Sequence, residues 1–319
     1  MNLVFVGDRC NDHSPNSGYD QLCSLFPDAG WLSGRALEAG RLEWHRDSKE
    51  SATTASRVLH VIYGDCSGKA LPELLRNRFP DARIVSSVHR PIHRLKEDSV
   101  ACAALNASDA IVAMAEVQAR ELADLGLNAT ISFIPHGVWT KVFGSASSLT
   151  VQTRQEVLLV GSFLRDWGGA KCVGALLAQA GVRSVAVGAG ARDNLTGNDV
   201  HIDVLPRVSE CELVEMYQRS AAVFLPFMDA TASNALLESM SAGCPVICPR
   251  MPSLIDYLGD DSDSFDPGRY DIAASRILHH VRNPSARDAR ARCLMARAET
   301  FDWSRLKPQY EAIYADVLT

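Results

Sequence analysis

Short apolar runs rich in β-branched residues alternate with helical patterns along almost the whole chain. The runs with the length and composition of strands are residues 2–7, 57–64, 83–89, 110–114, 129–137, 156–162, 184–190, 199–206, 221–227 and 244–249. Helical patterns between them include residues 170–181, 209–220 and 233–243. Strands that are apolar on both faces and separated by helices are typical of parallel sheets covered on both sides. The sequence therefore predicts an α/β protein.

The pattern restarts near residue 155, after a segment rich in Ser, Thr and Gly (residues 144–156) that we expect to be a linker. A chain of 319 residues is long enough for two hydrophobic cores. We therefore predict two Rossmann-like domains, residues 1–150 and 151–300, which bind ligands beyond the carboxyl ends of their strands. Residues 301–319 have an amphipathic pattern, and we expect a helix there that packs back on the first domain.

Composition and charge argue against several classes of protein. The chain contains no run of about 18 apolar residues, so no membrane-spanning helix is expected. Its first residues are those of a strand and lack the basic segment of a signal peptide. The formal net charge is −6 and there is no long basic tract, which argues against nucleic-acid binding. We expect a cytoplasmic protein, and the sequence leaves open both its oligomeric state and a peripheral contact with the inner face of a membrane.

The cysteines indicate neither a metal site nor a disulfide framework. Nine cysteines are scattered along the chain, and none forms a CxxC pair or a Cys/His cluster with zinc-ligand spacing. Several lie inside apolar segments, where a free cysteine behaves as a small hydrophobic residue. We therefore expect reduced thiols and no metal.

The most informative segment is a helix opened by small polar residues. Ser233 or Asn234 is a good N-cap, and Gly243 followed by Pro245 ends the pattern. The helix follows the strand 221–227, so its N-terminus lies where unpaired amides and the helix dipole attract phosphate. Glu238 lies too far from the N-cap to be the acid of a capping box, and the residues alone leave open a solvated surface acid.

The segment ATASNALLESMSAGCPVI (residues 230–247) resembles the donor-binding signature of the retaining, family 4-like GT-B glycosyltransferases known as glycosyl transferases group 1. The signature of that family has two glutamates separated by seven residues, followed by a small residue and Gly-x-Pro. Glu238 matches the second glutamate, which the resemblance implies binds the ribose hydroxyls of a nucleotide. Ala230 stands in place of the first glutamate, which leaves open whether catalysis is reduced or redirected.

Other segments resemble the same family in order and spacing, namely residues 107–126, 133–143, 207–227 and 301–314. The resemblance is good from about residue 57 to the end and moderate before that. It implies the GT-B fold, in which two Rossmann-like domains face each other across a cleft and a C-terminal helix crosses back. Residues 1–150 would be the acceptor domain and residues 151–300 the nucleotide-sugar donor domain.

The resemblance also implies roles for particular residues. His89 would lie by the transferring sugar, and Arg165 and Lys171 would neutralise the leaving diphosphate, although the usual Gly-Arg pair is replaced here by Gly161-Ser162. The donor-binding residues would be Val208, Ser209, Ser233, Asn234, Ala235, Leu236 and Glu238, and the acceptor-binding residues Ser17, Gly18 and Tyr19. The residues alone leave open a core or loop histidine, solvated loop cations, and a plain turn at residues 15–19.

The implied activity is transfer of a hexose or related sugar, with retention and without metal, from a nucleotide-diphosphate sugar. No cofactor is expected, and UDP or GDP would be the nucleotide of the co-substrate. The acceptor, whether a small molecule, a lipid-linked molecule or a glycan, is not identified. Two alternatives stay open: a non-catalytic nucleotide-sugar-binding subunit of a glycosylation complex, which Ala230 favours, and a nucleotide-sugar epimerase. The glycines of VGAGA (residues 187–191) lack the spacing of a dinucleotide fingerprint.

Overall fold

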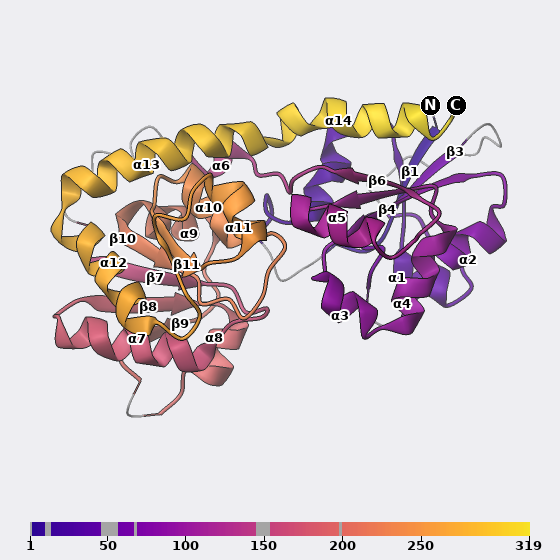
Figure 1. The fold of residues 1–319 in the computed structure, drawn as a ribbon. Coiled ribbons are helices and arrows are strands. Elements are labelled where there is room, and N and C mark those ends of the chain that lie inside the picture. The colour runs from indigo at the N-terminus through magenta and orange to yellow at the C-terminus, as the bar shows by residue number, and fades with distance from the viewer. Residues whose placement is uncertain (1, 10–13, 46–56, 67–68, 145–153, 198–199) are drawn as a thin grey trace. The chain divides into compact units, whose positions relative to one another are not determined.

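A computed structural model describes residues 2–9, 14–45, 57–66, 69–144, 154–197 and 200–319. The chain divides into two compact units (Figure 1). Unit 1 comprises Met1–Gly137 and Trp303–Thr319, and unit 2 comprises Val138–Asp302. Most of the segment predicted as a linker, residues 145–153, lies outside the described residues.

Unit 1 is built on a six-stranded parallel sheet. Its strands are β1 (Asn2–Val6), β2 (Gly30–Leu32), β3 (Arg57–Val61), β4 (Arg83–Val88), β5 (Ala110–Ala113) and β6 (Thr130–Phe133), in the spatial order β2-β1-β3-β4-β5-β6. Every pairing is parallel, with Val4 aligned to both Gly30 and Leu59. The strand order reverses between β1 and β3, which makes this pair the topological switch point of the sheet.

Helices cover both faces of this sheet. They are η1 (Tyr19–Leu25), α1 (Gly34–Glu38), α2 (Leu71–Arg78), α3 (Ile92–Lys96), α4 (Ser99–Ala104), η2 (Leu105–Ala107), α5 (Glu116–Ala123) and α14 (Trp303–Asp316). Helix α14 is the C-terminal segment of the chain, and it buries Leu306, Tyr310 and Ile313 on one face, as the amphipathic pattern predicted.

Buried hydrogen bonds fasten α14 to the sheet of unit 1. The hydroxyl of Tyr314 lies 2.6 Å from Nδ1 of His60 on β3, and the hydroxyl of Tyr310 lies 2.8 Å from that of Tyr19. Oγ of Ser87 on β4 joins the two pairs, at 2.7 Å from both the Tyr19 hydroxyl and Nε2 of His60. Because these groups are buried, each polar atom satisfied here avoids a desolvation cost of about 1–3 kcal/mol.

Unit 2 contains the second six-stranded parallel sheet. Its strands are β7 (Glu156–Val160), β8 (Arg183–Val187), β9 (Asp203–Leu205), β10 (Ser220–Phe224), β11 (Val246–Pro249) and β12 (Ser264–Phe265), in the order β12-β11-β10-β7-β8-β9. This is the strand order of the Rossmann fold, and its switch point lies between β7 and β10, where Leu158 aligns with Val223.

The helices of unit 2 bury apolar clusters against its sheet. They are α6 (Thr140–Phe143), α7 (Trp167–Gln179), α8 (Ala189–Asn194), α9 (Glu210–Arg219), α10 (Asn234–Ser241), α11 (Pro252–Leu258), α12 (Tyr270–Arg282), α13 (Pro284–Ala298) and η4 (Glu299–Phe301). One cluster is formed mainly by residues of α9, α10 and α11 and another by residues of α7 and α12. Successive residues of a strand point to opposite faces of the sheet and so belong to different clusters: Leu158 lies in the first and Val157 in the second.

The fold predicted from the apolar runs, two Rossmann-like domains with parallel sheets, is confirmed. Each predicted strand corresponds to an observed one, and the two strands missing from the prediction are β2 and β12. Both are edge strands, of three and two residues, and neither lies within a longer apolar run, whereas the equally short β9 (Asp203–Leu205) lies within the predicted run of residues 199–206. Within the described residues, no helix is long and apolar enough to cross a membrane.

Candidate functional site

The switch point of unit 2 holds the most distinctive arrangement of charge. The loop after β7 and the segment after β10 run beside each other, with Arg165 bridged to Phe227. Backbone hydrogen bonds from Asp166 N to Pro226 O (2.6 Å) and from Met228 N to Leu164 O (2.8 Å) fix this pairing. The two loops therefore form one rigid edge beyond the carboxyl ends of the strands.

Arg165 is a buried cation at this edge, with 8% of its surface exposed. Its Nη1 donates to Phe163 O (2.7 Å) and its Nη2 to Val160 O (3.0 Å), and its guanidinium lies 4.2 Å from the ring centroid of Phe227. Nε has no hydrogen-bond partner, and no carboxylate among the described residues pairs with Arg165. Burial lowers its pKa to about 10, so it is still charged at neutral pH.

Two residues near Arg165 have positive φ angles, and one of them is a glycine against which its guanidinium packs. Gly161 has φ +90°, and a Cβ there would lie 2.6 Å from Nη2 of Arg165. Leu164 has φ +52°, an uncommon left-handed conformation for a leucine. A small hollow beside the guanidinium is lined by Leu159, Val160, Gly161, Arg165, Trp167, Ala191 and Pro226. The guanidinium thus lines a narrow gap beyond the carboxyl ends of the strands, which is the end at which Rossmann-like sheets bind ligands.

The residue after Arg165 anchors this loop to two helices. Asp166 is the N-cap of α7 and accepts a hydrogen bond from Gly169 N (2.9 Å). It also accepts one from the hydroxyl of Tyr270 on α12. A Cβ at Gly169 would lie 2.4 Å from the ring of Tyr270, so the close approach of the two helices requires glycine.

Lys171 is placed differently from Arg165. It lies on α7 one turn beyond Trp167, is exposed, and does not line the hollow. The structure describes no hydrogen bond or ion pair for it. Trp167 rather than Lys171 is therefore the residue of α7 beside Arg165.

Helix α10 begins as the sequence predicted. Ser233 is the N-cap, and its hydroxyl accepts a hydrogen bond from Leu236 N at 3.4 Å. Ser233 and Asn234 are partly exposed, whereas all later residues of α10 are buried. The first amides of a helix have no partner within it, so this accessible N-terminus is suited to an anion.

Glu238 is not a solvated surface acid, the alternative that the sequence left open. It is 4% exposed, and its Oε2 accepts a hydrogen bond of 2.8 Å from the hydroxyl of Tyr217 on α9. A carboxylate is buried only where polar partners replace water. The sequence left that alternative open because the pattern of one helix does not show what surrounds it: all residues of α10 from Ala235 to Ser241 are buried.

Ala230, in the place of the family's first glutamate, lies inside the apolar cluster of α9, α10 and α11. It is 9% exposed, and its carbonyl accepts a hydrogen bond from the Ser253 hydroxyl at 2.5 Å. Asp229 beside it is partly exposed. An alanine therefore fits a position whose surroundings are largely apolar.

Val208 and Ser209, predicted to meet the base, lie at the start of α9. Ser209 forms a capping box with Glu212: its amide donates to the Glu212 carboxylate at 2.7 Å, and Glu212 N donates to its hydroxyl at 3.2 Å. Val208 packs against the apolar cluster of α9, α10 and α11. Both side chains thus have structural roles, and their part in donor binding stays a prediction.

The glycines of residues 187–191 serve packing between loops. Gly190 N donates to the hydroxyl of Ser162 at 2.8 Å. A Cβ at Gly190 would lie 2.8 Å from Cβ of Ser162, and Gly188 has φ +135°. The loops after β7 and β8 therefore touch, which explains these glycines without a dinucleotide.

In unit 1, His89 follows β4 and is partly buried. Its Nε2 donates to Ile62 O (2.9 Å), and its amide donates to Asp65 Oδ2 (2.8 Å). Its ring packs edge-on against Tyr19 at 4.4 Å and lies 4.9 Å from the ring of Tyr63. Burial lowers the pKa of His89, with Asp65 acting in the opposite direction, so the neutral ring carries its proton on Nε2 and Nδ1 is the acceptor.

The neighbours of His89 are held by their own ion pair. Arg90 forms an ion pair with Asp98 at 2.9 Å and donates to the carbonyl oxygens of Asp65 (3.2 Å) and Arg94 (2.8 Å). Unlike Arg165, this arginine has a carboxylate partner, and it closes the loop after β4.

The predicted acceptor residues Ser17, Gly18 and Tyr19 lie at the start of η1. Gly18 is its N-cap with φ 100°, and Ser17 is 8% exposed. Tyr19 is 1% exposed and uses its hydroxyl in the bonds to Ser87 and Tyr310. Its side chain has an internal role here, so acceptor binding by this segment stays a prediction.

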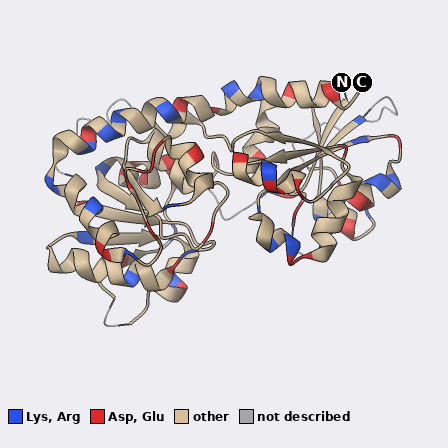
Figure 2. Ribbon diagram, viewed as in Figure 1, with Lys and Arg blue, Asp and Glu red and all other residues tan. Residues whose placement is uncertain are grey.

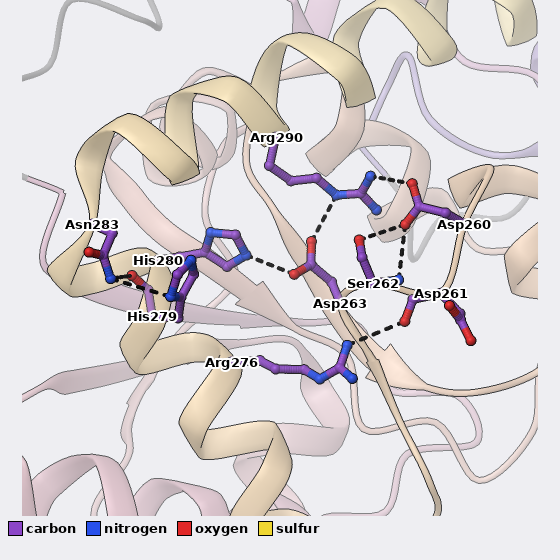
Figure 3. A network of polar contacts seen from close by, with 9 residues as sticks. All are labelled: Asp260, Asp261, Ser262, Asp263, Arg276, His279, His280, Asn283 and Arg290. Carbon is purple, nitrogen blue, oxygen red and sulfur yellow. Dashed lines mark hydrogen bonds and ion pairs between the residues drawn. The ribbon is translucent and has the colours of Figure 1, made fainter.

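A polar cluster in unit 2 lies away from the switch point (Figure 3). Asp263 accepts from His280 and from Arg290, each at 2.8 Å, and Arg290 also pairs with Asp260 at 2.7 Å. Burial raises the pKa of Asp263, but the bonds and charges of these partners outweigh burial and hold it below its usual value. These residues precede β12 or lie on α12 and α13, so they lie near the amino end of that strand.

Basic and acidic residues lie on the helices of both units, as Figure 2 shows. Helix α13 carries four arginines, of which Arg287 and Arg290 pair with carboxylates. Burial alone does not distinguish Arg165, since Arg287 is buried as well; the difference is that Arg287 pairs with Asp288, whereas Arg165 has no carboxylate partner among the described residues.

Comparison with known proteins finds a family that is similar to most of unit 2. Residues 155–283 match the family described as glycosyl transferases group 1. The match covers the switch point, Arg165 and Glu238, so the resemblance recognised in residues 230–247 is confirmed.

Two curated relatives match shorter segments of the chain. The O-antigen chain mannosyltransferase B of Escherichia coli is 28% identical over 108 residues, which are 34% of this chain and 28% of that protein. The phosphatidyl-myo-inositol mannosyltransferase of Propionibacterium freudenreichii subsp. shermanii is 34% identical over 83 residues, 25% of this chain and 21% of that protein. The matches therefore span less than a third of each relative.

Solved structures resemble the whole chain. A sucrose-phosphate synthase from Thermosynechococcus elongatus has a TM-score of 0.73 at 13% identity and covers 100% of this chain and 99% of its own. Anabaena Alr3699/HepE in complex with UDP has the same TM-score and identity, with 99% of this chain and 100% of its own covered. At this identity the likeness establishes the fold alone, and that fold is GT-B.

Sequence reasoning missed three residues of the site: Tyr217, Asp166 and Trp167. The Asp-x-x-Gly pattern after Arg165 is typical of an N-cap and signalled where α7 begins. The Ser-x-x-Glu spacing from Ser209 to Glu212 likewise signalled the start of α9. Nothing in the sequence pairs Tyr217 with Glu238, because the two residues lie on different helices that meet only in the folded domain.

Proposed function

We propose that this protein is a retaining glycosyltransferase that moves a sugar from a nucleotide-diphosphate sugar to an acceptor. The proposal rests first on Arg165, a buried cation that has no carboxylate partner among the described residues and lies beyond the carboxyl ends of the strands at the switch point of unit 2. Burying an uncompensated charge is unfavourable, and an anionic ligand that completes its hydrogen bonds offsets that cost. A diphosphate is such a ligand.

Helix α10 supports the same ligand. Its partly exposed N-terminus at Ser233 and Asn234 favours phosphate oxygens or sugar hydroxyls, and Ala235 and Leu236 supply the following amides. One turn further, Glu238 offers a carboxylate for the vicinal ribose hydroxyls. We propose that Val208 and Ser209 meet the base through the backbone at the start of α9.

The curated relatives support a hexose as the transferred sugar, because both are named mannosyltransferases. We propose mannose first, from GDP or UDP. Retention means that the acceptor oxygen bonds to the anomeric carbon on the face that the diphosphate leaves. Arg165, with Lys171 as an exposed second cation, would stabilise the charge that develops on the departing oxygen.

Unit 1 would supply His89 and the acceptor site. Nδ1 of neutral His89 can accept a hydrogen bond from a sugar hydroxyl, since Nε2 is committed to Ile62 O. Residues 17–19 follow the first strand of that unit, and we propose their backbone for the acceptor, whose chemistry is not assigned. The described cysteines are free thiols, which fits the reducing cytoplasm.

A second function, nucleotide-sugar binding without transfer, has one observation in its favour. Ala230 provides no carboxylate where the family signature has its first glutamate, and its carbonyl is already bound by Ser253. A protein of this kind would hold the nucleotide sugar through Arg165 and Glu238 and leave it intact.

The experiment that separates the two uses the purified full chain with GDP-mannose, UDP-glucose and ADP-glucose. Slow hydrolysis of one donor, or transfer to a cell-extract acceptor, is followed by mass spectrometry. Turnover that is lost in Arg165→Gln supports the transferase. Binding of a donor by calorimetry with no turnover under either condition favours the binding protein, and no binding of any nucleotide sugar refutes both.

A further inference from the structure

Tyr217 occupies a distinctive position between the two charged residues of the site. It lies on α9 and is fully buried. Its hydroxyl donates a hydrogen bond of 2.8 Å to Oε2 of Glu238 on α10. Desolvation is the largest cause of its raised pKa, Glu238 raises that pKa further, and the positive charge of Arg165 acts in the opposite direction. The pKa of Tyr217 therefore depends on the charges of both Arg165 and Glu238.

The bond constrains Glu238 rather than Tyr217. A Glu side chain has three rotatable torsions, whereas the aromatic ring of Tyr217 is held by the cluster of α9, α10 and α11. Because the phenol can only donate to a carboxylate oxygen, the bond fixes which oxygen faces α9. Because the bond reduces the number of rotamers that Glu238 can adopt before a ligand binds, it lowers the entropy cost of binding.

The protonation state of Tyr217 is compatible with this role at any physiological pH. Its raised pKa keeps the hydroxyl protonated, so the donor is always present. The capping box at Ser209 and the N-cap at Ser233 fix where the two helices begin, and the buried residues of both helices belong to one apolar cluster. The Tyr217–Glu238 pair is therefore a rigid feature of unit 2.

We propose that Tyr217 is a positioning residue that holds the Glu238 carboxylate in the orientation that receives the two ribose hydroxyls, and so sets the preference for ribonucleotides over deoxyribonucleotides. This inference rests on the proposed function, because it takes the ligand of unit 2 to be a nucleoside diphosphate. It goes beyond that function by naming the residue that confers the selectivity for ribose.

The test measures the affinity of the full chain for GDP, UDP and their 2′-deoxy forms by calorimetry. The readout is the ratio of the dissociation constants of the deoxy form and the ribo form. We expect Tyr217→Phe to lower this ratio by about tenfold, to the value of Glu238→Gln, with a smaller loss of affinity for the deoxy form, which keeps only the 3′-hydroxyl as a partner of Glu238. The double variant should show no further loss, because both changes remove the same interaction.

The matched control is Tyr310→Phe, which removes another buried phenol hydrogen bond, in unit 1. It should lower the melting temperature without changing the ratio. Tyr217→para-aminophenylalanine retains a donor at the same position, so it should fold and keep the ratio of the native protein, even if Tyr217→Phe fails to fold.

Two results would overturn the inference while leaving the proposed function intact. One is a folded Tyr217→Phe protein that loses affinity for ribo and deoxy forms equally, as expected of a residue that only supports the core. The other is loss of the ratio in the folded para-aminophenylalanine variant. If the native protein binds no nucleoside diphosphate, the proposed function itself fails.

Discussion

The loops that follow β4 in unit 1 and β7 in unit 2 each place an arginine beyond the carboxyl end of a strand. The two arginines differ in the groups that surround their charge. In unit 1, Arg90 pairs with Asp98 and donates to two carbonyl oxygens. In unit 2, Arg165 donates to two carbonyl oxygens and lies over the face of Phe227, and none of the carboxylates that the structure describes pairs with it. The first arginine completes a loop, whereas the second retains a charge that a ligand can neutralise.

The same contrast extends to the polar interiors of the two units. Unit 1 satisfies His60, Ser87 and its tyrosines with one another, in a buried chain that holds α14. Unit 2 uses its buried polar pair, Tyr217 and Glu238, beside the switch point. The buried polar chain of unit 1 has a structural role, as the Asp263 cluster has in unit 2, whereas the Tyr217–Glu238 pair is the one that we propose serves a ligand. Three further predictions test this difference.

The largest expected effect follows from replacing the two arginines. Arg165→Gln should lower kcat/KM for the donor by about a hundredfold or more, the usual cost of losing a donor to developing negative charge. Its free energy of unfolding should stay unchanged or rise slightly, because a buried charge without a carboxylate partner is removed. Steady-state kinetics and urea unfolding measure the two quantities.

Arg90→Gln is the matched control and should show the reverse. We expect it to lower the free energy of unfolding by about 1.5–3 kcal/mol, the worth of hydrogen bonds between charged groups, and to leave the affinity for nucleoside diphosphates unchanged. If Arg165→Gln binds nucleotide as well as the native protein does, the contrast between the two loops has no functional meaning.

The second prediction concerns pH and His60. Burial, with a smaller contribution from the charge of His89, lowers the pKa of His60 to about 3. Its pKa in the unfolded chain is about 6.5, so as the pH falls the unfolded state binds the proton first and the folded state loses stability. The contribution is fully present above the unfolded pKa and is lost between there and the folded pKa, at about 1.4 kcal/mol per pH unit.

Urea unfolding of unit 1, followed by tryptophan fluorescence, should therefore lose about 2 kcal/mol from His60 between pH 7 and pH 5. His60→Gln can still bond to both hydroxyls and cannot take up a proton, so its stability should fall less over that range. His93→Gln, a change at an exposed position of the same unit, should retain the pH dependence of the native protein. Equal slopes for His60→Gln and the native protein would contradict the prediction.

The smallest effect is expected for Lys171. Because this side chain is exposed, its attraction to a diphosphate acts through solvent and should be worth about 1 kcal/mol or less. Lys171→Ala should weaken nucleotide binding a few-fold at low salt and not at all at about 1 M salt, where the Debye length is about 3 Å. A loss as large as that of Arg165→Gln at both salt concentrations would show that Lys171 contacts the ligand directly.

Most of the fold could be predicted from the sequence, because its strands are long apolar runs separated by helices of matching length. The N-cap at Ser233 and the buried face of α14 also follow from local patterns. The prediction missed β2 and β12 because these strands of three and two residues are not part of a longer apolar run, as the three residues of β9 are. It left Glu238 open as a surface acid because the pattern of one helix does not show how many neighbours surround that helix.

The candidate site divides in the same way. The sequence by itself determined the family signature and the presence of an arginine and a carboxylate after the right strands, because these are properties of residue type and spacing. Only the tertiary structure decided that Arg165 is buried and without a carboxylate partner, that Trp167 rather than Lys171 lies beside it, and that Tyr217 holds Glu238. The physical reason is that burial and hydrogen bonding between residues of different elements depend on how those elements pack, which no local pattern specifies.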